Sequence, residues 1–259
     1  MLSIDHLGMA WPGVDGPVET VHDISLEVAE GDFVCIVGPS GCGKTTLLKC
    51  LSGLLTATSG QVSLHGRPVD GPPERMALVF QEYGRSLFPW MTVQGNIALP
   101  LRQQRVPRAE RERAVAAALE AVDLPGVARQ YPWQLSGGMQ QRVAIARALA
   151  YQPEIMLMDE PFASVDAQTR ADLEDLIRSV WREYRMSVVL VTHDIDEAVY
   201  LGERVVVLSD KPTVVREELT VDLPADRDQL ATKALPEFNE IRSRVYNLIR
   251  RAPSGRPTV

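Results

Sequence analysis

Residues 38–45 read Gly-Pro-Ser-Gly-Cys-Gly-Lys-Thr, which follows the pattern G-x-x-x-x-G-K-T. The three glycines allow the backbone to curl, so that its N–H groups converge on phosphate oxygens. Lys44 can reach the β- and γ-phosphates, and the Thr45 hydroxyl can bind Mg²⁺. The apolar run 33–37 indicates a buried strand before the loop, and 45–52 indicates a helix after it, whose N-terminus adds partial positive charge. The sequence therefore predicts a nucleoside triphosphate site.

Two carboxylates follow a second apolar run, because residues 155–160 read Ile-Met-Leu-Met-Asp-Glu. A buried strand that ends at Asp159 presents its carboxylate at the C-terminal edge of a sheet, where ligands of open α/β folds bind. There Asp159 can hold Mg²⁺ directly or through water. Glu160 is placed to polarise a water for in-line attack on the γ-phosphate. Taken alone, the pair could also be a solvated acidic turn, and the phosphate loop favours the catalytic interpretation.

A second glycine motif stands at 135–142, Leu-Ser-Gly-Gly-Met-Gln-Gln-Arg. Ser136 as N-cap, followed by Gly137 and Gly138, exposes backbone amides at the start of a helix. One chain does not need two such anion sites around one triphosphate. The second site is explained if it binds the triphosphate of another subunit that faces this one head to tail. We therefore expect a dimer of identical or similar chains.

Length and composition bound the class of protein. The 259 residues suffice for one large α/β domain or two modest ones. The net charge of −7 provides no global basic field for a nucleic acid. No run approaches the roughly 20 apolar residues of a membrane span, and the N-terminus lacks the features of a signal peptide. Three cysteines without metal-like spacing are expected to be free thiols in a reducing cytoplasm.

The chain changes character twice along its length. It is strand-rich to about residue 80, helical from about 86 to 150, and strand-containing again afterwards. Continuous apolar runs at 155–158 and 187–191, with a helix between them, indicate a βαβ crossover in a parallel sheet. The tail after Pro212 contains one expected amphipathic helix, at 236–250.

The motif at 135–142 resembles the signature sequence of the ATP-binding cassette (ABC) ATPases, and the resemblance extends over essentially the whole chain. It implies an α/β P-loop NTPase (RecA-like) core with an N-terminal antiparallel β-subdomain and an inserted α-helical subdomain. On this basis the core comprises residues 1–85 and 151–210, and the helical subdomain with the signature comprises 86–150. Residues 211–259 are then a C-terminal tail with a short helix and no regulatory domain.

The resemblance also assigns residues. Gln81 resembles the Q-loop glutamine, which senses Mg²⁺ and the γ-phosphate, and His193 resembles the switch histidine, although a lone histidine there could simply cap an element. Trp11 resembles the aromatic that stacks on adenine; the alternative is a tryptophan packed under the N-terminal sheet. Ser164-Val165-Asp166 stands where the D-loop of the family usually reads Ala-Leu-Asp.

These assignments make up the expected Mg-ATP site. The catalytic residues are Glu160, His193 and Gln81, and the Mg²⁺ ligands are Thr45, Gln81 and Asp159. The nucleotide-binding residues are Trp11, Gly38, Pro39, Ser40, Gly41, Cys42, Gly43, Lys44, Thr45, Thr46, Ser136, Gly137, Gly138 and Asp166. In the family scheme two cassettes sandwich two ATP molecules, closure excludes water, and loss of the γ-phosphate reopens the dimer.

The segments 84–93 and 194–201 resemble the nitrate/sulfonate/taurine subfamily of ABC importers. This implies an ATPase subunit that drives uptake of a small anionic solute through a separate permease. Its place is then peripheral, on the cytoplasmic face of the inner membrane, with a solute-binding protein as an indirect partner. Phe88, Pro89 and Trp90 suit a groove for a short helix of the partner; alternatively they are a local core of the helical subdomain.

Two other functions stay open at this point. A non-transport ATPase of the cofactor-assembly type is also a single cassette, and an exporter or lipid-transport ATPase shares all of the nucleotide chemistry. The DNA-repair type is excluded because only about 50 residues separate Gln81 from Leu135, too few for its long coiled coil. Sulfonate, taurine, nitrate, bicarbonate and a pyrimidine-like precursor all remain possible solutes.

Overall fold

The computed structural model describes residues 1–81, 86–163 and 165–250. The chain divides into two compact units. The first unit comprises Met1–Pro73 and Ser187–Val259, and the second comprises Glu74–Met186. Gly84, Arg85 and Ser164, which the sequence singled out, lie outside the described residues. The functional division at residues 86 and 150 stays a prediction.

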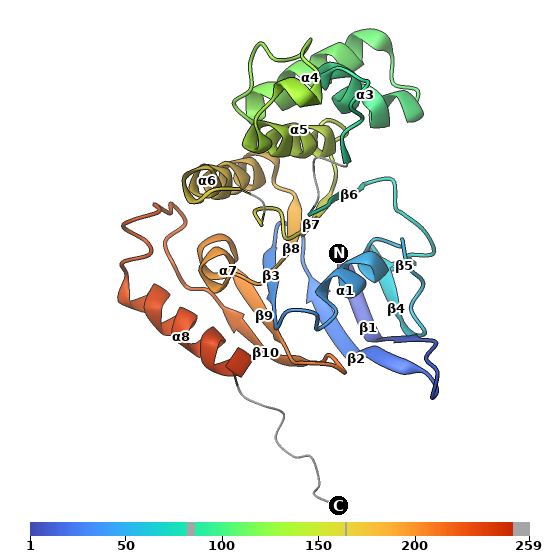
Figure 1. Cartoon of the computed structure of the whole chain (residues 1–259), viewed down its shortest axis with the longest axis vertical. Coiled ribbons are helices and arrows are strands. Elements are labelled where there is room, and N and C mark those ends of the chain that lie inside the picture. The colour runs from blue at the N-terminus through green and yellow to red at the C-terminus, as the bar shows by residue number, and fades with distance from the viewer. Residues whose placement is uncertain (82–85, 164, 251–259) are drawn as a thin grey trace, which may run out of the picture. The chain divides into compact units, whose positions relative to one another are not determined.

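The first unit contains an antiparallel sheet built from the N-terminal segment, in the order β2-β1-β4-β5 (Figure 1). Gly60 in β4 has φ +72°, and a Cβ there would lie 2.2 Å from the carbonyl oxygen of His6 in β1. Only glycine permits this close approach of two strands. The sheet agrees with the expected antiparallel β-subdomain; its strands are β1 (Leu2–Trp11), β2 (Val18–Val28), β4 (Ser59–Leu64) and β5 (Arg67–Pro68).

The first unit also contributes four strands to a second sheet, in the order β10-β9-β3-β8. Strand β3 runs parallel to both β8 and β9, and every residue of β3 and β8 is buried, as expected of a parallel sheet covered on both faces. The strands are β3 (Phe33–Val37), β8 (Ser187–Thr192), β9 (Arg204–Leu208) and β10 (Val215–Thr220). The helices of this unit are α1 (Lys44–Leu51), α7 (Ile195–Leu201) and α8 (Pro236–Arg250).

Strand β10 lies in the tail, where the sequence indicated only a helix. Its residues read Val-Arg-Glu-Glu-Leu-Thr, and of these only Leu219 is buried. A pattern with so little apolar alternation carries a weak strand signal, and the strand forms because it pairs antiparallel with β9. The helix expected at 236–250 is confirmed as α8.

The second unit pairs two parallel strands with a group of helices. Strands β6 (Met76–Val79) and β7 (Ile155–Asp159) align with Val79 opposite Met158. Figure 1 shows α3, α4 and α5 gathered together, and each of them contacts the other two. No helix in the described part of the chain is long and apolar enough to cross a membrane. The helices are α3 (Val93–Gln103), α4 (Arg108–Ala121), α5 (Gly137–Leu149) and α6 (Ala167–Tyr184).

Asn96 on α3 fixes the segment that leads into this helix. Its side chain is fully buried, and Oδ1 accepts a hydrogen bond from the Phe88 N–H at 2.7 Å. Its Nδ2 donates to the carbonyl oxygens of Phe88, Met91 and Thr92, at 3.1 to 3.2 Å. One buried amide therefore bonds to four backbone groups of this loop. The Phe88 and Thr92 carbonyl oxygens also accept from the N–H groups of Met91 and Asn96, so it is the Phe88 N–H and the Met91 carbonyl oxygen that depend on the side chain.

We predict that Asn96→Ala strongly destabilises the protein. The substitution leaves the Phe88 N–H and the Met91 carbonyl oxygen without this partner, and each buried unpaired group costs about 1–3 kcal/mol. Urea unfolding followed by circular dichroism measures the change in the free energy of unfolding. The control is Asn247→Ala on the exposed side of α8, which should stay within about 0.5 kcal/mol of the parent. Equal stabilities of the two variants would contradict this account of Asn96.

Candidate active site

The phosphate loop connects β3 to α1 in the first unit, as the sequence predicts. Gly41 and Gly43 have φ of +75° and +118°, in the left-handed region that L-residues rarely adopt. Gly43 is the N-cap of α1, and no acidic residue lies in the first turn of that helix. The loop therefore ends at a helix N-terminus whose partial positive charge suits an anion. Gly38 has a different reason to be glycine, since a Cβ there would lie 3.0 Å from the Leu208 Cβ.

The Lys44 side chain is almost fully buried, and it folds over its own loop. Its Nζ donates to the carbonyl oxygens of Gly38 at 2.9 Å and Pro39 at 3.1 Å. An ammonium group carries three N–H donors, so these two bonds fix the head group inside the curl of the backbone. Ser40 and Thr45 are exposed, whereas Pro39 and Thr46 are partly buried.

Two threonines that sequence reasoning missed hold this loop in place. Thr213, fully buried, donates its hydroxyl hydrogen to the Cys42 carbonyl oxygen. Its backbone bonds to Thr20 and His22 of β2. Thr20 itself fills the space beside Gly43, where a Cβ would lie 2.8 Å from its Cγ2. No local pattern could identify these threonines, because they are distant from the loop in sequence.

His193 lies between β8 and α7, and it is exposed. The helix cap is Asp194, whose Oδ1 accepts from the N–H groups of Asp196 at 2.9 Å and Glu197 at 3.2 Å. The Asp194 N–H donates to the Thr192 hydroxyl at 3.0 Å, and this hydroxyl donates to the buried Glu197 carboxylate at 2.6 Å. The capping alternative for His193 is therefore wrong, because its neighbour caps the helix.

Trp11 ends β1, where it pairs with Val18 of β2. Its side chain is 43% exposed, which disagrees with the alternative of a tryptophan packed under the sheet. An exposed aromatic face on a strand end is available for stacking against a planar base.

The second unit brings Gln81 and Glu160 together, although 78 positions lie between them in the chain. Strands β6 and β7 run in parallel, so that their carboxyl ends meet, and the Gln81 Nε2 donates to the Glu160 Oε2 at 3.2 Å. Asp159 is the last residue of β7 and is only 6% exposed. Glu160 has φ +43°, an uncommon conformation for a residue other than glycine, and such outliers gather at functional sites.

The signature residues form a second helix N-terminus, in the second unit. Ser136 is the N-cap of α5, and its Oγ accepts from the Met139 N–H at 3.3 Å, which confirms the expected cap. Ser136 and Gly137 are exposed. Gly138 packs against α6, since a Cβ at this position would lie 2.5 Å from the Thr169 Cγ2.

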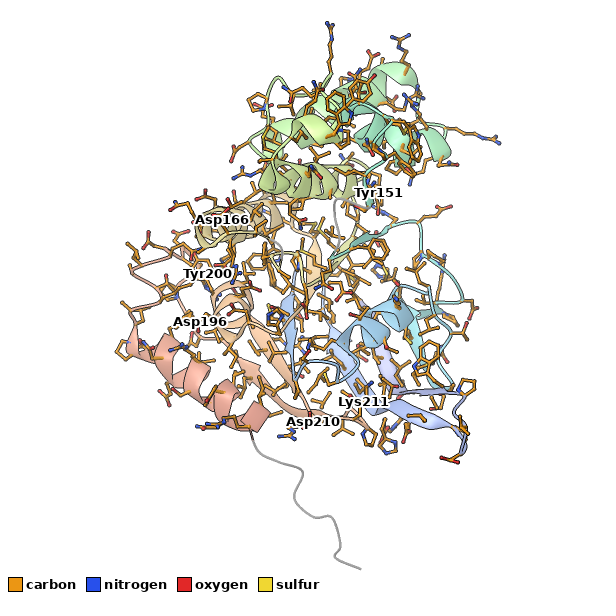
Figure 2. All side chains as sticks on the ribbon, viewed as in Figure 1. Tyr151, Asp166, Asp196, Tyr200, Asp210 and Lys211 are labelled. Carbon is orange, nitrogen blue, oxygen red and sulfur yellow. The ribbon has the colours of Figure 1, made fainter. Side chains whose placement is uncertain are left out.

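Asp166 is the N-cap of α6, the helix whose Thr169 contacts Gly138. Its Oδ1 accepts from the Thr169 N–H at 3.0 Å, and its Oδ2 accepts from the Thr169 hydroxyl at 2.7 Å. These bonds stabilise the carboxylate and lower the pKa of Asp166. Thr169 thus joins Asp166 to Gly138, a link that the motif spacing did not indicate (Asp166 is labelled in Figure 2).

Residues 21–163 match the ABC transporter family. The chain is 46% identical over 227 residues to the aliphatic sulfonates import ATP-binding protein SsuB of Bacillus licheniformis, covering 87% of this chain and 85% of that protein. It is 41% identical over 254 residues to the nitrate import ATP-binding protein NrtD of Synechocystis sp., covering 96% of this chain and 95% of that protein. The chain belongs to the ABC transporter family.

A solved structure carries the same fold. The dimeric ATP-binding cassette MJ0796, in a post-hydrolysis state bound to ADP and Pi, superposes with a TM-score of 0.74 at 31% identity. The match covers 85% of this chain and 99% of that one. The fold is the P-loop NTPase fold of an ABC cassette, as expected, and the protein is an ATP-binding ATPase. The expected resemblance to the nitrate and sulfonate importers is confirmed.

Burial governs the thiol chemistry of the phosphate loop. Cys42 is only 2% exposed, and burial raises the pKa of its thiol, an effect that nearby Lys44 partly opposes. Cys50 on α1 is 3% exposed, and burial raises its pKa from 9.0 to about 11. At pH 8 the Cys50 thiolate is therefore about 100-fold scarcer than for a thiol of ordinary pKa.

We predict that iodoacetamide modifies both cysteines far more slowly in the folded protein than in the urea-unfolded chain at pH 8. Peptide mapping by mass spectrometry follows each site separately, and Cys50 should react more slowly than Cys42. Because the thiolate is the nucleophile, both rates should rise as the pH increases above 9. A folded-state rate for Cys42 equal to its unfolded-state rate would contradict this assignment.

Proposed function

We propose that this chain is the ATP-hydrolysing subunit of an ABC importer that drives uptake of a small anionic solute through a separate permease. We argue for the permease partner from two observations: a groove of about 1160 Å³ between α3 and α4, and the exposed Trp90 in the segment that precedes α3. The similarity of the chain to sulfonate and nitrate import proteins supports a small anion as the solute.

Each residue of the proposed nucleotide site has a role. The phosphate loop, residues 38–46, binds the phosphates, Trp11 stacks on adenine and His193 contacts the γ-phosphate. Gln81 and Asp159 serve Mg²⁺, and Glu160 orients the attacking water. The hydrogen bond from Gln81 to Glu160 supports this role, because it holds the carboxylate in one orientation.

Mg²⁺ fits the donors proposed for it. Thr45, Gln81 and Asp159 offer a hydroxyl, an amide and a carboxylate oxygen, the hard ligands that Mg²⁺ prefers. Asp159 is nearly buried, and the Gln81 amide nitrogen is engaged with Glu160, so the amide oxygen is the atom that Gln81 would offer to a cation. When bound, Mg²⁺ neutralises charge on the β- and γ-phosphates.

Dimerisation with a second copy completes the proposed cycle. The N-terminus of α5, where Ser136 and Gly137 are exposed and Gly138 is half-buried, would bind the γ-phosphate of ATP held by the partner copy, and Asp166 would lie beside the same interface. Helix N-termini without acidic residues in the first turn suit this task, and α5 has none. The dimeric state of the similar cassette MJ0796 supports the arrangement.

We predict that Glu160→Gln binds ATP and accumulates as a dimer, because hydrolysis no longer removes the γ-phosphate that holds the copies together. General-base removal should lower kcat by about 10²–10⁴-fold. Light scattering after size exclusion, with and without Mg-ATP, measures the mass. Adding Lys44→Ala to the same variant should restore the monomer by weakening phosphate binding. An ATP-loaded monomer of Glu160→Gln would disprove the scheme.

The groove is amphipathic, as a docking site for a short helix should be. Ala98, Val115 and Leu119 supply apolar surface. The charged lining carries both signs and comprises Arg102, Arg108, Arg111, Glu112, Glu120 and Asp123. Thr92, which caps α3, lines the groove, and the chain just before it carries Phe88 and Trp90 with ring centroids 5.3 Å apart.

The exposure of Trp90 argues against a local core made of all three residues. Trp90 is 73% exposed and Pro89 is exposed, whereas Phe88 is half-buried and Leu87 is buried, and these two supply the local packing. Exposed aromatic patches of this kind mark interaction sites. We assign this surface to a cytoplasmic helix of the permease, which would place the chain peripherally on the inner face of the membrane.

Affinity capture of the tagged chain from detergent-solubilised native membranes tests this proposal. We expect a multi-span permease and its solute-binding protein to co-purify, and Trp90→Ala to lower their recovery about tenfold or more. Leu230→Ala, at an exposed leucine of the first unit, is the control for non-specific adhesion and should retain them. Capture of a soluble scaffold without any membrane protein would favour the cofactor-assembly alternative. A permease without a solute-binding protein would favour an exporter.

A further inference from the structure

A chain of contacts leads from His193 to the C-terminal helix α8. The turn that carries His193 is fixed by Asp194, which caps α7 through the N–H groups of Asp196 and Glu197. Asp196, which is labelled in Figure 2, in turn forms an ion pair with Arg242 of α8, with its Oδ1 2.6 Å from the arginine Nε. All of these residues belong to the first unit.

Helix α8 is anchored independently of this ion pair. Phe238, Val245 and Leu248 are buried, and α8 packs on α7, β9 and β10. On the β10 side, Arg244 pairs with Glu217, and Arg216 donates to the Leu248 carbonyl oxygen. Removing the Arg242 ion pair therefore leaves the helix in its place against the sheet.

Packing between α7 and α8 is incomplete beside His193. A cavity of about 590 Å³ lies there, with His193, Asp194 and Asp196 on one side and Arg242 and Tyr246 on the other. The two helices pack together, and at this opening Asp196 in the first turn of α7 makes a polar contact to α8. The ion pair between Asp196 and Arg242 spans the gap.

We propose that Arg242 is a positioning residue for ATP hydrolysis, through which the C-terminal helix orients the His193 turn. This inference rests on the role proposed above for His193 at the γ-phosphate. Both partners of the ion pair are about half exposed, and such pairs contribute little to global stability. Their loss instead alters the local geometry, and small misplacements of a catalytic group lower the rate strongly.

The test compares two arginines on one helix. Arg242→Ala should lower kcat roughly three- to tenfold without weakening ADP binding, because ADP lacks the γ-phosphate that His193 contacts. Arg242→Lys keeps the charge and should restore at least about half of the rate. Arg244→Ala, which cuts the ion pair to β10 instead, should leave kcat within about twofold of the parent. Equal losses in Arg242→Ala and Arg244→Ala would overturn the inference, since α8 would then act only through folding.

A double-mutant cycle with His193→Ala distinguishes a failure of this inference from a failure of the role proposed for His193. If Arg242 acts through His193, Arg242→Ala adds no further loss to His193→Ala. A full additional loss in the double variant, or an unchanged kcat in Arg242→Ala alone, would overturn the inference while leaving His193 in its role. An unchanged kcat in His193→Ala would instead overturn the proposed role of His193, and with it this inference.

Discussion

The first unit depends on one tight reversal of the backbone between β3 and α1. Gly41 and Gly43 adopt left-handed conformations there, and Lys44 closes the curl from inside by donating to two loop carbonyls. Such a loop keeps its shape only if its surroundings hold it, since each residue fixed loses conformational entropy. Thr20 and Thr213 provide that support from β2 and from the segment after β9. The strands of this unit thus hold an anion-binding turn in its conformation.

The second unit solves a different problem, which is to hold a carboxylate next to an amide at the ends of two strands. Parallel pairing of β6 with β7 brings Gln81 to Glu160. Glu160 occupies a left-handed conformation, which costs of order 1 kcal/mol or more and persists because the surrounding structure determines it. A strained, hydrogen-bonded glutamate directly after a buried aspartate fits a group that orients water.

Helix caps recur at the places where function is proposed. Ser136, Asp166 and Asp194 each cap a helix with a side-chain oxygen. The caps leave neighbouring groups exposed for other tasks: the backbone at Gly137 in one case and the imidazole of His193 in another. Asp166 also reaches Thr169, the residue that Gly138 packs against, so that two motifs of the second unit share one contact. Caps that also arrange a site make local stability and function interdependent.

The sequence alone determined the phosphate loop, the strand that ends at Asp159, the N-cap at Ser136 and helix 236–250, because glycine spacing, apolar runs and caps are local signals. It could not identify β10, whose polar residues form a strand only against β9. It also missed Thr20 and Thr213 beside the loop, Thr169 beside Gly138, and the ion pair from Asp196 to Arg242. These contacts join residues far apart in the chain or on separate elements. Only the tertiary structure decides them, because sheet pairing and helix packing, not local propensity, determine which side chains meet.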